Sequence, residues 1–255
     1  MPRRAVFALI AGLALAPLAA AADDKPVVTV YAAASLREAF DAAAPAFTKR
    51  TGYPVRFSYG GSDMLAAQLL QGAPADVFVS ANQLQMTRVT DLVATPRTLA
   101  RNRLVVIAPK NDDRVAALAD LAKPGVKVVL AASAVPVGAY ARTALANLAK
   151  EPAYGADFAS RVNANVVSEE TDVKAVAAKV GLGEADAGIV YATDVTPVLA
   201  PKVRVLRFPP GAAPEATYPL AVLKSAPNAA GARAFAGFIT SPAGLAFLKA
   251  RGFEE

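Results

Sequence analysis

The sequence predicts an α/β protein in which mostly parallel sheets are flanked by helices. Short β-branched runs alternate with amphipathic stretches along the chain, which is the order expected of parallel strands joined by helices. No Gly/Ser-rich tether separates two halves, so a second domain would be joined to the first by strands, as a two-lobed hinge protein requires. The 255 residues are enough for one large or two ordinary domains.

The beginning of the mature chain predicts a β-α-β-α-β succession, which places ligand sites at the carboxyl ends of its strands. Ser35 and Ser62 each precede a helical pattern, so we expect both to be N-caps. The predicted strands cover residues 27–34, 55–59 and 75–80, and the predicted helices cover residues 36–48 and 64–71.

The rest of the chain continues this alternation. Predicted strands cover residues 104–109, 126–131, 161–167, 187–191, 203–208 and 218–223. Predicted helices cover residues 138–150, 171–180, 229–239 and 242–251.

The composition excludes several kinds of chemistry, because the sequence has no Cys, His or Trp. Without Cys there is no disulfide, no thiolate nucleophile, no Cys-ligated metal and no acylated lipoprotein anchor. Without His, the commonest general base and metal ligand are missing. An enzyme would have to work with carboxylates, Lys, Tyr or Ser alone.

The N-terminus predicts a secretory signal peptide over residues 1–22. Arg3 and Arg4 precede an uncharged apolar run that ends in small residues. Their removal leaves a weak basic excess, and no Lys/Arg run resembles a nucleic-acid or membrane patch, so we expect no nucleic-acid partner. An exported chain without an anchoring Cys fits the periplasm.

Four junctions between strands and helices favour oxyanion binding. A helix N-terminus has unsatisfied N–H groups and a positive partial charge, so it attracts anions without a formal cation. Taken alone, each Ser is more simply an N-cap; together, in a chain without a catalytic His or Cys, the junctions indicate an oxyanion site. They are Ala34-Ser35, Gly61-Ser62, Pro136-Val137-Gly138 and Thr171-Asp172-Val173.

Five segments give the chain its resemblance to a known family. They are VTVYAAASL (28–36), GAPADVFVSA (72–81), RLVVIAP (103–109), AGIVYATD (187–194) and YPLAV (218–222). In this order and spacing the chain resembles the periplasmic molybdate-binding proteins of ABC transporters over residues 27–253.

The resemblance implies a two-lobed type II periplasmic binding protein, expected to be monomeric. One lobe would comprise residues 23–103 plus 218–255 and the other residues 104–217, with residues 104–109 and 218–223 as crossover strands at the hinge. The implied function is capture of molybdate or tungstate for an ABC transporter permease in the inner membrane, with no enzymatic activity and no cofactor besides the ligand.

The resemblance also implies the ligand-binding residues. In the family, hydroxyls and main-chain N–H groups hold the oxyanion without a salt bridge or a free cation site. Val137 would act through its N–H, although the family usually has Ala there, and Val173 precedes the tyrosine of GIVY by 18 residues. The residues carried over are Ser35, Ser62, Val137, Val173 and Tyr191.

The sequence also allows other ligands and another class of function. Asp63 adjoins Ser62 and either complements the helix dipole or accepts a hydrogen bond from a protonated anion such as phosphate. Sulfate is a further alternative. Glu169, Glu170 and Asp172 raise the same ambiguity, including metal binding. A Ser hydrolase using Ser35 or Ser62 would lack an evident base.

Overall fold

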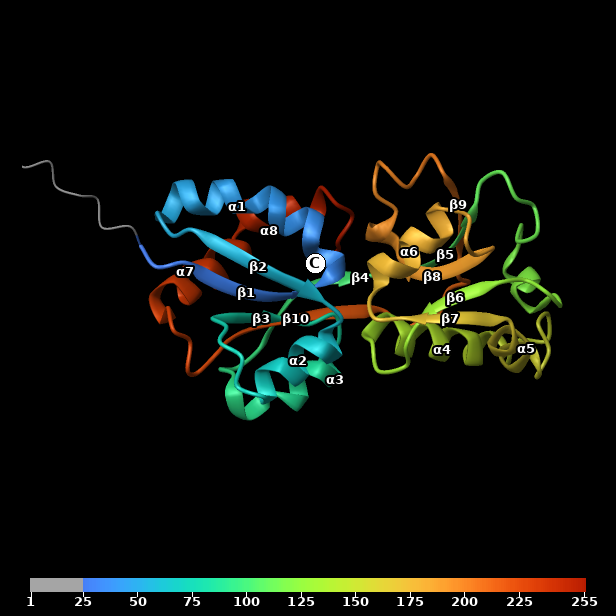
Figure 1. Ribbon diagram of the computed structural model, residues 1–255, viewed down its shortest axis with the longest axis horizontal. Coiled ribbons are helices and arrows are strands. Elements are labelled where there is room, and N and C mark those ends of the chain that lie inside the picture. Colours follow the sequence, from blue (N-terminus) through green and yellow to red (C-terminus); the bar gives the residue numbers. More distant parts are fainter. Residues whose placement is uncertain (1–24) are drawn as a thin grey trace, which may run out of the picture.

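The computed structural model describes residues 25–255, so the expected signal peptide, residues 1–22, lies outside the described range. Two five-stranded sheets, each flanked by helices, follow one another along the long axis of the molecule (Figure 1). This arrangement confirms the predicted fold class. We call the sheet that contains β1, with its helices, the first lobe, and the sheet that contains β5, with its helices, the second lobe.

The first sheet has the strand order β2-β1-β3-β10-β4. β1 pairs in parallel with β2 and β3, whereas β10 is antiparallel to both of its neighbours. The sheet is therefore parallel except for one strand. Its strands are β1 (Val28–Ala33), β2 (Val55–Gly60), β3 (Val77–Val79), β4 (Arg97–Asn102) and β10 (Ala216–Val222).

The second sheet has the order β7-β6-β8-β5-β9. β6 pairs in parallel with β7 and β8, and β5 is antiparallel to both β8 and β9. Its strands are β5 (Leu104–Pro109), β6 (Val128–Ala131), β7 (Val166–Glu170), β8 (Ala187–Tyr191) and β9 (Val203–Arg207).

The two sheets share one topology. In each, the reversed strand is the one by which the chain arrives from the other lobe: β5 follows β4 after Arg103, and β10 follows β9 after residues 208–215. The chain thus passes between the lobes twice, and the two strands expected at the crossovers begin where it does so. The parallel strands β1 and β2 end toward the second lobe (Figure 1).

Helices cover both faces of the first sheet (Figure 1). The period-2 alternation of β3 explains why: Val77 and Val79 join the larger hydrophobic core, and Phe78 between them joins a second cluster with Leu65 and Met86 of the opposite helices. Helices α1 (Arg37–Thr51), α7 (Ala229–Ile239) and α8 (Pro242–Lys249) pack together on one face, and α2 (Ser62–Leu70) and α3 (Gln83–Arg88) on the other.

In the second lobe, α4 and α6 both contact β6 and β8, and they lie on opposite faces of the sheet (Figure 1). The helices of this lobe are α4 (Pro136–Leu148), α5 (Phe158–Ala164) and α6 (Val173–Gly181). Short 3-10 helices complete the fold: η1 (Ala34–Leu36), η2 (Thr90–Leu92), η3 (Leu118–Ala122) and η4 (Ala192–Asp194). Within residues 25–255, no helix has the length and apolar character that a membrane crossing requires.

One predicted element is wrong, and two were missed. Residues 161–167 were expected to form a strand, but residues up to 164 belong to α5, because Phe158 and Val162 are buried on one helical face. The strand β7 begins only at Val166. The missed elements are β4, whose polar sequence RTLARN hides its pattern, and α3, which has only six residues.

Candidate functional site

A small cavity lies between the two lobes, at the carboxyl ends of β1, β2, β3 and β8 and at the N-termini of α2, α4 and α6. Its volume is about 10 Å³, about enough for one water molecule, which leaves no room for a sugar or a peptide. All five residues expected from the sequence line it. The lining residues are Ala33, Ala34, Ser35, Gly60, Gly61, Ser62, Ala81, Val135, Pro136, Val137, Asp172, Val173 and Tyr191.

Tyr191 is the last residue of β8 and is buried. Its Oη has no hydrogen-bond partner among the residues that the structure describes. Burial raises the pKa of the Tyr191 phenol well above its ordinary value, so the group stays protonated and can donate. A buried hydroxyl without a partner is costly, and here it borders a cavity, where a bound acceptor would satisfy it.

Ser62 was expected to be the N-cap of α2, and this prediction is wrong. The N-cap is Gly61, and Ser62 is the first helical residue. Its Oγ instead accepts a hydrogen bond of 3.0 Å from the backbone N–H of Ala81. Because a backbone N–H can only donate, the hydroxyl hydrogen of Ser62 remains available to a ligand.

Ser35 was also expected to be an N-cap, and this prediction is wrong for a similar reason. Ser35 lies inside η1, whose N-cap is Ala33, and its side chain caps no helix. Its Oγ lies 2.9 Å from the Oη of Tyr218 in the strand β10. The serine is therefore held by the sheet, and it lines the cavity from the helix start.

Val137 and Val173 present backbone N–H groups at helix starts. Asp172 caps α6 by accepting from the N–H groups of Lys174 and Ala175, which leaves the first-turn N–H of Val173 without an intrahelical acceptor. Val137 follows Pro136 in the first turn of α4, where no side chain caps the helix. Both N–H groups are thus suited to an anion.

Gly138 explains why α4 can begin so close to the end of β6. A Cβ at this position would lie 2.1 Å from the carbonyl oxygen of Ala132. Only glycine therefore permits this approach, which brings the helix start to the cavity.

Four acidic residues for which the sequence allowed more than one kind of ligand differ in their places in the structure. Asp172 lines the cavity, with one carboxylate oxygen engaged in capping α6. Asp63 is not among the lining residues of the described chain. Glu169 pairs with Arg142, and Glu170 pairs with Lys179. Within residues 25–255, no group of three or more acidic side chains could hold a metal ion, and no Lys or Arg lines the cavity.

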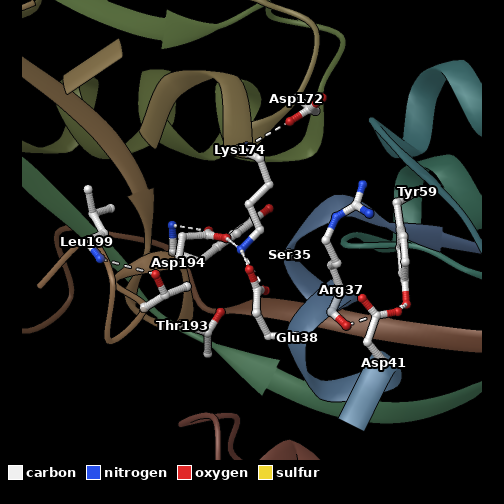
Figure 2. Close-up of polar contacts among 12 residues, drawn as sticks. Ser35, Arg37, Glu38, Asp41, Tyr59, Asp172, Lys174, Thr193, Asp194 and Leu199 are labelled. Atoms are coloured by element: carbon white, nitrogen blue, oxygen red, sulfur yellow. Dashed lines mark hydrogen bonds and ion pairs between the residues drawn. The ribbon is translucent and has the colours of Figure 1, made fainter. Parts of the chain in front are cut away.

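The lobes contact each other beside the cavity. Lys174 of α6 lies between two carboxylates (Figure 2): its Nζ is 2.7 Å from Glu38 of α1, across the cleft, and 3.0 Å from Asp194 in its own lobe. Gln85 of α3 also crosses the cleft, donating to the carbonyl of Ala134 at 2.9 Å. These contacts join the two lobes beside the cavity.

Lys174 and Asp194 each influence the pKa of the other. Burial raises the pKa of Asp194 to about 6, and the opposing effect of Lys174 does not cancel it. Burial acts to lower the pKa of Lys174, but the carboxylates of Asp194 and Glu38 outweigh burial and raise it. Lys174 is therefore a fixed cation next to the site.

The sequence did not reveal the residues that lie next to the site without lining the cavity. Tyr218 lies within the YPLAV segment, but 183 residues separate it from Ser35. Glu38 and Lys174 are 136 residues apart. Such pairs carry no local pattern, so only the fold reveals them.

Two lobes with a small cavity between them are the architecture of a solute-binding protein. The model of the family described as "Bacterial extracellular solute-binding protein" matches residues 28–254, and the chain belongs to this family. Within it, the chain is 38% identical over 233 residues to the molybdate-binding protein ModA of Mycobacterium tuberculosis (strain ATCC 25618 / H37Rv), covering 89% of this chain and 84% of that protein. The resemblance found in the sequence is thereby confirmed.

Solved structures agree on the fold. The substrate-binding domain of a putative molybdenum ABC transporter from Clostridium difficile is 30% identical, with a TM-score of 0.66, covering 91% of this chain and 99% of that one. The sulfate-binding protein SubI from Mycobacterium tuberculosis H37Rv has a TM-score of 0.77 at 19% identity, covering 89% and 86%. The fold alone therefore does not choose the anion.

Proposed function

We propose that this chain is the solute-binding component of an ABC importer for molybdate or tungstate. It captures the anion between its lobes in the periplasm and delivers it, as a monomer, to a permease in the inner membrane. The observation that carries the proposal is the buried hydroxyl of Tyr191, which borders the cavity and lacks a partner among the described residues. The names of the relatives support the choice of anion.

Five donors would hold the anion in this proposal. Ser35, Ser62 and Tyr191 donate through hydroxyls, and Val137 and Val173 through backbone N–H groups. A fully deprotonated oxyanion offers only acceptors, so a shell of donors matches it. Each hydrogen bond from a neutral donor to the charged anion contributes about 1.5–3 kcal/mol, which replaces the salt bridge that the cavity does not provide.

A ligand panel in a thermal-shift assay tests the proposal. Molybdate or tungstate at 1,000 times its Kd should stabilise the protein by about 4 kcal/mol. Stabilisation by sulfate alone would move the assignment to the alternative anion. A clear shift with phosphate and none with molybdate or tungstate would refute the proposal.

The variant Ser62→Ala connects the panel to the site. It removes one donor, so we expect Kd to rise roughly 10- to 100-fold. Ser160→Ala is the matched control, because Ser160 is an exposed residue of α5 whose Oγ donates to the carbonyl of Asp157.

The proposed role is capture of the anion without a chemical step, so the parent protein should hydrolyse no ester substrate.

A further inference from the structure

A chain of buried hydrogen bonds leads from the crossing between the lobes to the cavity. It begins at Asn102, the last residue of β4, and continues to Tyr218 of β10 and Ser35 of η1. The Nδ2 of Asn102 is 3.3 Å from the Oη of Tyr218, which is 2.9 Å from the Oγ of Ser35. All three residues are at most 2% exposed, so water does not compete for these groups.

The direction of this chain is fixed at its first member. The backbone N–H of Arg103 donates to Oδ1 of Asn102 at 2.9 Å. Since a backbone N–H cannot accept, this contact assigns the amide oxygen and turns Nδ2 toward Tyr218 and Thr193. The Nδ2 group donates to both, at 3.3 Å and 2.8 Å.

The next two members inherit this direction. Tyr218 accepts from Asn102, and its own hydrogen can then be donated to Ser35, 2.9 Å away. Burial raises the pKa of the Tyr218 phenol, which keeps it a neutral donor. In this arrangement Ser35 accepts from Tyr218, which leaves the hydrogen of Ser35 for the cavity that it lines.

Ser62 is arranged in the same way by a different group. The N–H of Ala81 occupies an acceptor position of Ser62 Oγ, as Tyr218 does for Ser35. Both serines of the cavity are therefore held as donors, one by the backbone and the other by side chains of β4 and β10.

We propose that Asn102 and Tyr218 are positioning residues that lock Ser35 as a hydrogen-bond donor, so that the site rejects an oxyanion that presents its own proton at this position. The inference rests on the proposed function and deepens it, because it assigns selectivity to residues that do not line the cavity. Rejection arises because a protonated oxygen would meet a donor and lose its hydrogen bond.

The substitution Asn102→Asp reverses the direction of the hydrogen bonds that link residue 102, Tyr218 and Ser35. One carboxylate oxygen still accepts from Arg103, and the other can only accept from Tyr218, so Tyr218 turns its hydrogen away from Ser35. Ser35 then donates to Tyr218 and presents a lone pair to the cavity. We expect the Kd for molybdate to rise about tenfold or more, whereas binding of hydrogen phosphate is unchanged or tighter.

Tyr218→Phe interrupts the chain, so we expect the ratio of molybdate to hydrogen phosphate affinity to fall here as well. In the double variant, Asn102→Asp should add no further loss, because its effect passes through the missing hydroxyl. Asn165→Asp is the matched control: Asn165 donates to the carbonyls of Leu121 and Lys123, away from the cavity, and its substitution should leave the ratio unchanged.

Isothermal titration with molybdate and with phosphate at a pH where hydrogen phosphate prevails provides the readout. The inference would be overturned if Tyr218→Phe left the ratio of molybdate to hydrogen phosphate affinity unchanged. It would also be overturned if Asn102→Asp lowered that ratio equally in the presence and in the absence of the Tyr218 hydroxyl. Tyr218→Phe keeps the test decisive if the buried Asp prevents folding. Failure of the parent protein to bind molybdate or tungstate would instead refute the proposed function, which separates the two results.

Discussion

A bound ligand would explain the environment of the Tyr191 hydroxyl. It is buried at the cavity, and its oxygen bonds nothing in the described chain. Tyr191→Phe should therefore leave the unliganded protein as stable or up to about 1–3 kcal/mol more stable, while the Kd for molybdate rises roughly 10- to 100-fold. Urea denaturation and titration calorimetry measure the two effects. A large loss of stability would show that the hydroxyl has a structural role instead.

Asp194 gives the protein a pH-dependent stability at the residue scale. Its carboxyl has a pKa of about 6 in the folded protein against an ordinary 3.8. Between these values the folded state holds a proton that the unfolded state has lost, so stability falls as pH rises. The free energy of unfolding, relative to that of Asp194→Asn, should decrease from pH 4 to pH 7. A constant or increasing difference in urea titrations would contradict the assignment.

At the scale of elements, the approach of α2 to the second lobe depends on a glycine. A Cβ on Gly61 would lie 2.5 Å from the carbonyl oxygen of Thr171 across the cleft. The backbone of Gly61 has φ −60° and ψ 134°, which alanine also adopts. Gly61→Ala should therefore hinder closure. In its own lobe only the Asp63 carboxylate has to turn away, because its Oδ1 would lie 2.6 Å from the new Cβ.

We expect Gly61→Ala to raise the Kd for the anion at least about tenfold with little change in the melting temperature of the unliganded protein. Gly237→Ala is the control, because a Cβ at Gly237 of α7 meets no atom within 4 Å. Calorimetric titration of both variants checks this, and equal affinities would argue that the lobes close less tightly around the anion than the structure indicates.

The sequence predicted most elements because their hydrophobic periods are regular. It failed where tertiary contacts decide, as in α5, where Phe158 and Val162 select a helix over the predicted strand. It identified Ser35 and Ser62 as cavity residues but assigned them as helix caps. Their true partners, Tyr218 and the N–H of Ala81, are distant in the chain, so no local pattern could reveal them.

At the scale of the whole molecule, the two lobes repeat one topology and meet through few polar contacts. The pair between Glu38 and Lys174 spans the cleft, and both side chains are partly exposed, so its contribution is reduced by solvent. Glu38→Gln should raise the Kd a few-fold, mainly through faster release. Asp157→Asn is the control, because it removes the exposed pair between Asp157, the residue before α5, and Arg161 within that helix. Stopped-flow release measurements that find equal rates would exclude Glu38 as a closure contact.

We expect the cavity between the lobes to be the place where a tetrahedral oxyanion is bound. The most direct test of this expectation is a crystal structure of the protein grown with tungstate, with anomalous scattering collected at the tungsten edge. We expect one strong anomalous peak between the hydroxyls of Ser35, Ser62 and Tyr191, with the N–H groups of Val137 and Val173 directed at the anion. A peak elsewhere, or an empty cavity at saturating tungstate, would contradict it.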